Sequence, residues 1–116
     1  MRWSIIILFF IIFSCTRTEI PFGTEEQCED EITYSNQVKE IIDVSCAYAG
    51  CHVSGFGSGN FENYAGMESF LTSGQFSNRV IGLKDMPPIW APDGPTELTE
   101  EQLTTIICWS QNDFKE

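Results

Sequence analysis

The stretch Cys46-Ala47-Tyr48-Ala49-Gly50-Cys51-His52 brings two thiols and the only imidazole of the chain together within one short segment. Apolar residues before it recur at helical spacing and predict a helix over 37–45, with Ser35 or Asn36 as its N-cap. The residues after it, up to Asn60, are rich in glycine and predict a loop whose backbone can approach another group closely. We therefore expect the reactive side chains where a helix passes into a loop.

Three further helical segments are expected after this loop. Apolar spacing predicts a helix over 63–73, with Gly74 as its stop, and a short helical stretch over 78–82. The last helix, 100–111, begins after Thr99 with a capping box. No segment alternates convincingly with the period of a β-strand, so the sequence predicts an all-α fold of three to four short helices and long loops.

Length and charge limit the possible functions. The chain has 116 residues, with 17 Asp and Glu against 6 Lys and Arg, and a net charge of −11. Nucleic-acid binding needs clustered positive charge, which this sequence lacks, so we expect no nucleic-acid partner. A single domain this small has little core and often depends on disulfides, a metal or a bound group. We therefore expect something to fill its centre.

The N-terminal residues have the pattern of an export signal. Arg2 precedes the apolar run 5–13, which is too short to span a hydrocarbon layer of roughly 30 Å as a helix. The segment 12–15 resembles a bacterial lipobox, in which the cysteine, here Cys15, becomes the lipidated first residue of the mature protein. The alternatives are an ordinary signal peptide cut elsewhere and a short uncleaved anchor.

Three parts of the chain follow from this pattern. We expect a lipoprotein signal peptide over 1–14, a flexible acidic tether over 15–31 and the folded domain over 32–116. The domain would then lie in the cell envelope, held by its lipid on the periplasmic side or at the outer membrane.

The residue types around His52 are those that covalent haem attachment requires. Two thiols add to the vinyl groups of the haem, and a histidine directly after the second cysteine faces the iron. The usual spacing is C-x-x-C-H, whereas four residues separate Cys46 from Cys51 here. The two additional residues must bulge outward if both thioethers form, and small residues at Ala47, Ala49 and Gly50 permit this.

Further along the chain, Met86 stands in a Met-Pro-Pro loop. Over 34–114 the chain resembles the small monohaem c-type cytochromes, through the helix V-x-x-I-I before the first cysteine, the Cys-His pair, the glycine-rich loop, the Met-Pro-Pro loop and the last helix. This resemblance implies a cytochrome c-like domain in which Cys46 and Cys51 hold haem c, His52 is the proximal ligand and Met86 the sixth ligand.

The resemblance also implies a function. A neutral thioether ligand favours ferrous iron and raises the reduction potential, and two protein ligands leave no open position for substrate. The chain is therefore expected to be an electron-transfer protein and not an enzyme. Its acidity suggests a basic-surfaced redox protein or membrane enzyme as partner, and its lipid anchor attaches it to the membrane.

Other assignments of these residues remain open. Cys46 and Cys51 can form a local disulfide, which would make the chain a disulfide-stabilised lipoprotein module with a binding or structural role and no haem. A zinc site has only three grouped ligands where structural zinc usually takes four. Met67 is a rival to Met86 as axial ligand, although it lies at helical spacing with apolar residues.

If haem takes Cys46 and Cys51, then Cys28 and Cys108 are left over. We expect them to pair and so to tie the start of the domain to the last helix; two free buried thiols are the alternative. Arg79 and Lys84 are the candidate cations for a haem propionate. Several aromatic residues are expected to wall the haem or the core, namely Phe56, Phe61, Phe76, Trp90 and Trp109.

Overall fold

Helices and loops make up the part of the chain that the computed structural model describes, which is residues 28, 31–91 and 93–116. The helical segments are η2 (Tyr34–Val38), α1 (Lys39–Ser45), α2 (Tyr64–Thr72), α3 (Gln75–Ser77), η3 (Asn78–Gly82) and α4 (Glu100–Gln111). These residues contain four α-helices and no strand, so the predicted all-α class is confirmed. The signal peptide 1–14, the lipidation at Cys15 and most of the tether 15–31 lie outside the described residues.

The first helix begins earlier than its sequence pattern predicts. It opens with the π-helical turn η2, and its N-cap is Thr33, whose Oγ1 accepts a hydrogen bond from the backbone N–H of Asn36. The expectation of a cap at Ser35 or Asn36 is therefore wrong. The wider turn buries both Tyr34 and Val38, a pair four positions apart that a capping rule does not consider.

The middle of the chain folds into two short helices on either side of one glycine. In α2 the side chain of Asn63 caps the helix by accepting from the N–H of Gly66. Gly74 adopts φ 74° after this helix, a left-handed conformation that favours glycine, and it ends α2 as predicted. The helix α3 was not expected; it starts directly after Gly74 and continues into η3, whose bounds match the prediction for 78–82.

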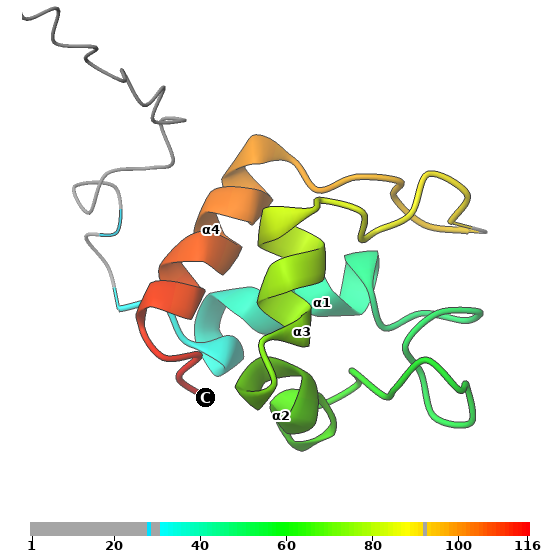
Figure 1. Cartoon of the computed structure of the whole chain (residues 1–116), viewed down its shortest axis with the longest axis horizontal. Coiled ribbons are helices and arrows are strands. Elements are labelled where there is room, and N and C mark those ends of the chain that lie inside the picture. Colours follow the sequence, from blue (N-terminus) through cyan, green and yellow to red (C-terminus); the bar gives the residue numbers. More distant parts are fainter. Residues whose placement is uncertain (1–27, 29–30, 92) are drawn as a thin grey trace, which may run out of the picture.

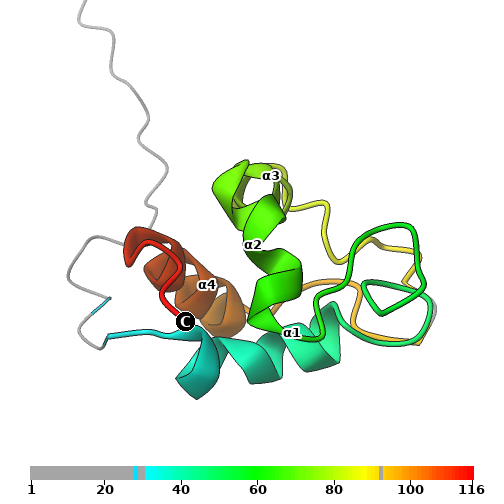
Figure 2. The ribbon, with the colours of Figure 1, turned by 90° about the horizontal axis from the view of Figure 1, so that it is seen from below.

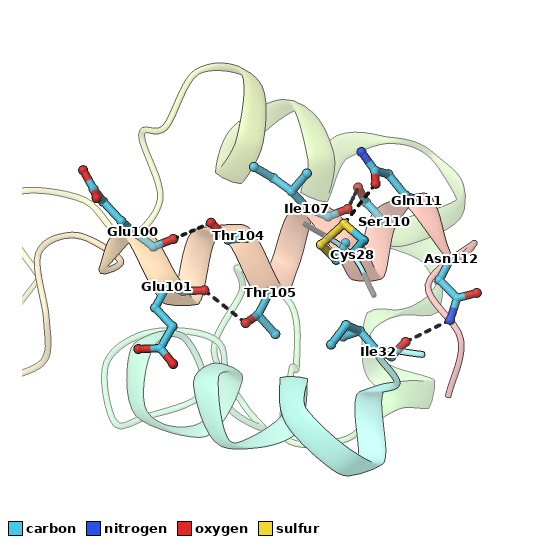
Figure 3. The surroundings of a disulfide bond; sticks show 11 residues. Cys28, Ile32, Glu100, Glu101, Thr104, Thr105, Ile107, Ser110, Gln111 and Asn112 are labelled. Atoms are coloured by element: carbon cyan, nitrogen blue, oxygen red, sulfur yellow. Dashed lines mark hydrogen bonds between the residues drawn. A yellow bond between two sulfur atoms is a disulfide. The ribbon is translucent and has the colours of Figure 1, made fainter. Parts of the chain in front are cut away.

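The last helix, α4, has the predicted bounds and the predicted capping box. The Oγ1 of Thr99 accepts from the N–H of Gln102, and the side chain of Gln102 accepts from the N–H of Thr99. In Figure 3, Cys28 lies against this helix, where it forms the expected disulfide with Cys108, across 80 positions of sequence. The amide of Asn112 donates to the carbonyl of Ile32, so both ends of the domain are held together.

The core lies where α4 meets η2 and η3. Trp109, Met67 and Val38 are fully buried there. The carbonyl of Lys115 accepts from both the Trp109 indole and the backbone N–H of Tyr34, which closes the C-terminal turn onto the core. In Figures 1 and 2 the long loops that follow α1 and η3 extend together from one side of this helical group. None of the described helices is long and apolar enough to cross a membrane.

Candidate functional site

The two long loops and the adjoining helices enclose a cavity of about 250 Å³. Cys46, Cys51, His52 and Met86 all line it, so the structure brings together the four residues that the sequence singled out. Met67 does not line this cavity and is fully buried in the core, which agrees with its apolar spacing. The remaining wall residues are Ser45, Gly50, Ser58, Phe61, Phe70, Gln75, Phe76, Arg79, Val80, Pro87, Pro88 and Trp90.

A tight turn takes up the two additional residues between the cysteines. The N–H of Cys51 donates to the carbonyl of Tyr48 at 3.0 Å, and Gly50 inside this turn has φ 90°. The N–H of His52 then donates to the carbonyl of Cys46 at 3.0 Å, which closes the segment on itself. The longer spacing therefore still places both cysteines and the histidine on one cavity.

Tyr48 joins the two loops beside the site. A β-carbon added to Gly94 would lie 2.3 Å from Cζ of Tyr48, so this ring rests directly on the glycine backbone of the second loop. Burial raises the pKa of the Tyr48 phenol to about 12. A larger residue at Gly94 would have to displace the Tyr48 ring.

Three hydrogen bonds fix the position of His52. Its backbone N–H donates to Cys46, its carbonyl accepts from the N–H of Phe61 at 2.8 Å, and its Nδ1 lies 2.9 Å from the carbonyl oxygen of Ser58. A carbonyl can only accept, so Nδ1 carries the proton in this bond and Nε2 keeps its lone pair. Burial is the main cause that lowers the pKa of the imidazole, which favours the neutral ring. Metal-binding histidines commonly show this arrangement, because the second hydrogen bond fixes the tautomer.

The two cysteines of the site are thiols in the structure, whereas Cys28 and Cys108 are bonded to each other. Cys46 is partly buried and packs against the core. Burial, reinforced by the neighbouring Cys51, raises the pKa of the Cys46 thiol to about 12. The thiol is therefore protonated at neutral pH and is a weak nucleophile in the protein alone.

Met86 enters the cavity from a loop that is tied to η3. The N–H of Asp85 donates to the carbonyl of Arg79 at 3.0 Å, so the residue before Met86 has a fixed place relative to that helix. Pro87 and Pro88 follow and also line the cavity. Met86 itself is partly buried and packs against the core.

The aromatic wall differs in part from the expectation. Phe61 and Phe76 are buried and line the cavity, as expected, and Phe70 joins them edge-on to Phe61 at 5.0 Å between ring centroids. Trp90 also lines it, with 73% of its surface exposed. Trp109 belongs to the core alone. Phe56 is 52% exposed, lies outside the buried core and does not line the cavity, so its assignment to the wall was wrong.

The glycine-rich loop makes close approaches, but to its own protein. A β-carbon on Gly59 would lie 2.5 Å from Cζ of Phe70, and one on Gly66 would lie 2.1 Å from the carbonyl oxygen of Asn60. These glycines therefore let the loop pack against α2. The sequence predicted close approach without indicating the partner.

Ser45 is a wall residue that the sequence did not single out as functional. It is only 2% exposed, it lines the cavity, and its Oγ has no hydrogen-bond partner among the described residues. A buried hydroxyl without a partner costs free energy, so a ligand able to accept its hydrogen bond would be stabilised here. The available signal was its place on the buried stripe of the helix, directly before Cys46.

Within the described part of the chain, no group of three or more His, Cys, Asp or Glu side chains is arranged to hold a metal ion by itself. Comparisons of the chain with protein-family models, with curated proteins and with solved structures give no match. The function is therefore inferred from the residues of the cavity.

Proposed function

We propose that this chain is an extracytoplasmic, lipid-anchored electron carrier that holds one covalently bound haem c. The observation that carries the proposal is the state of His52, whose Nδ1–H is taken up by the carbonyl of Ser58, in a cavity shared with two thiols and a thioether. This arrangement leaves Nε2 as the free nitrogen for a metal ligand. When bound, haem c supplies a reversible one-electron exchange at its iron.

The donor set of the cavity fits this group. Cys46 and Cys51 would attach it, each thiol adding across one vinyl double bond and passing its hydrogen to the adjacent carbon. His52 and Met86 would supply the protein ligands of the iron, and the neutral thioether would raise the potential. The cavity volume of about 250 Å³ lies just below the roughly 300 to 1,000 Å³ common for ligand sites, and the exposed side chain of Trp90 lines the cavity.

The other parts of the proposal rest on the sequence. The pattern at 1–14 and Cys15 supports export and a lipid anchor. The net charge of −11 supports a basic-surfaced redox protein or membrane enzyme as the partner, since complementary charge speeds the encounter of two proteins. An electron carrier needs no open coordination position, so no enzymatic reaction is proposed.

The central experiment is to express the full chain in a bacterial host that attaches haem c. We expect Soret and α bands after reduction with dithionite, and a haem stain that survives denaturing electrophoresis. The Cys46→Ser/Cys51→Ser variant should lose the covalent stain. The Cys28→Ser/Cys108→Ser variant is the matched control, and it should keep the stain in whatever protein accumulates.

An absence of bands and stain in the full chain, in a host shown to mature another c-type cytochrome, would contradict the proposal. The chain would then be a disulfide-stabilised lipoprotein module with a binding or structural role, and the Cys28–Cys108 bond is compatible with that alternative.

The assignment of the sixth ligand has its own test. Met86→Ala should lower the reduction potential, because the thioether that favours ferrous iron is lost. Met67→Leu is the control, since Met67 is fully buried and does not line the cavity. This variant should leave the potential unchanged and cost less than about 1.5 kcal/mol of stability. An unchanged potential in Met86→Ala would refute Met86 as ligand and spare the haem attachment.

A further inference from the structure

One wall residue of the cavity is a cation. Arg79, from η3, is the only Lys or Arg among the described residues that line it. The wall around it is mainly apolar, with aromatic and proline side chains such as Phe76, Pro88 and Trp90. Lys84, the other cation considered from the sequence, does not line the cavity. A positive charge at the edge of a mainly apolar site can recognise an anion, and no other Lys or Arg among the described wall residues competes for it.

Arg79 is held in place from two directions. Its Nε donates to both carboxylate oxygens of Asp85, at 2.7 and 2.9 Å. The backbones of the two residues are also joined, since the N–H of Asp85 donates to the carbonyl of Arg79 at 3.0 Å. This pair fixes the guanidinium relative to the loop that carries Met86, the next residue after Asp85.

The contact with Asp85 uses only one edge of the guanidinium. Nε is the bonded atom, and no hydrogen bond in the described part of the chain uses the terminal amino groups of Arg79. A guanidinium presents its N–H donors in a planar fork that matches a second carboxylate. The arginine therefore keeps donors available, and its side chain, 37% exposed, stands at the rim of the cavity and not in its depth.

We propose that Arg79, positioned by Asp85, is the receptor for a carboxylate of the molecule that fills the cavity. The ligand class is a flat apolar molecule that carries at least one carboxylate. This inference rests on the proposed function, in which that carboxylate is a propionate of haem c. Cys46 and Cys51 would fix the rotation of the haem through its vinyl groups, and Arg79 would hold one carboxylate at the other side of the molecule.

The test compares three variants of the haem-loaded protein. Arg79→Gln removes the positive charge, and Arg79→Lys keeps the charge but lacks the planar set of N–H donors of a guanidinium. Lys39→Gln is the matched control, because Lys39 also pairs with an acid, Asp43, but lies at the start of α1, about 9 Å along the helix from Ser45, and does not line the cavity. The readouts are covalent haem content, midpoint potential and the resonance Raman bending band of the propionates, which reports hydrogen bonding to their carboxylates.

We expect all variants to retain covalent haem, since none touches the two cysteines. Arg79→Gln should lower the midpoint potential, because the loss of a nearby positive charge favours ferric iron, and it should move the propionate band. Arg79→Lys should restore most of the potential but not the band, and Lys39→Gln should match the wild type in both. If Arg79→Gln carries haem and matches Lys39→Gln in potential and band, the inference is overturned while the proposed function stands. If the wild-type chain carries no haem, the proposed function fails first, and this assignment of the carboxylate fails with it.

Discussion

The imidazole of His52 lies flat on the ring of Phe61, with 4.1 Å between the ring centroids and 7° between the planes. Phe61 is 5% exposed and packs edge-on against both Phe70 and Phe76. The orientation of the histidine is therefore set by the hydrophobic core as well as by its hydrogen bond to Ser58. A core that fixes the plane of a ligand ring before anything binds lowers the ordering cost of binding.

Truncation of the Phe61 side chain should destabilise the core and remove the support of the His52 imidazole. Phe61→Ala should lower the free energy of unfolding by about 3 to 5 kcal/mol, because it leaves a cavity beneath the imidazole. Urea denaturation followed by circular dichroism measures the loss. Phe56→Ala is the control, since Phe56 is 52% exposed, and it should change the stability by less than about 0.5 kcal/mol. Equal effects of the two substitutions would show that Phe61 does not support the core.

The Cys28–Cys108 bond should contribute a large part of the stability. It closes a loop across 80 positions, which in the chain-entropy model stabilises the fold by about 4.5 kcal/mol. Cys28→Ser/Cys108→Ser should therefore lose about this amount in a denaturation experiment. Wild-type protein treated with a reductant should follow the same unfolding curve as the variant. A variant as stable as the oxidised wild type would contradict the role of the bond.

Removal of the buried hydroxyl of Ser45 should stabilise the chain. In the Cys46→Ser/Cys51→Ser background, which cannot attach haem, Ser45→Ala should raise the free energy of unfolding by about 1 kcal/mol, because Ser45 Oγ is buried without a partner. Ser110→Ala is the matched control. Its hydroxyl donates to the carbonyl of Ile107 at 2.6 Å, so its loss should destabilise by about 1 kcal/mol. Effects of the same sign at both positions would rule out the unsatisfied state of Ser45.

The haem-free chain should become less stable at alkaline pH because of Cys46. Its pKa rises from 9.0 to about 12 on folding, so above pH 9 the unfolded chain releases a proton that the folded chain still holds. The unfolded state is then favoured by up to about 1.4 kcal/mol for each pH unit until the folded thiol also ionises. Unfolding curves at several pH values measure this slope. Cys46→Ala should reduce it, and an unchanged slope would show that the thiol is not desolvated by the fold.

Local rules predicted the elements that local interactions stabilise. The capping box at Thr99 satisfies backbone donors within its own turn, and apolar spacing with Gly74 as stop marks the other helix, so α4 and α2 could be located to within a residue. The start of the first helix was misplaced because Tyr34 is fixed from far away. Its N–H bonds the carbonyl of Lys115, and its ring packs on Trp109. Neither partner is visible from the neighbouring sequence.

In the candidate site, too, local properties could be predicted and long-range contacts could not. The types and spacing of Cys46, Cys51 and His52 follow from the sequence, because the chemistry of thiols and imidazole does not depend on the fold. Nothing in the sequence indicates that the carbonyl of Ser58 fixes the tautomer of His52, or that Asp85 holds Arg79 at the rim. Those contacts arise between segments that meet only after the loops have folded.

The sequence by itself determined the helical class, the last helix and the set of chemically reactive residues, since periodicity, capping and residue type are local properties. The tertiary structure alone decided that the unpartnered hydroxyl of Ser45 lies on the cavity with His52, and that an apolar wall with one cation surrounds them. The reason is physical: a cavity is the space between segments, and its shape depends on how helices and loops far apart in the sequence pack.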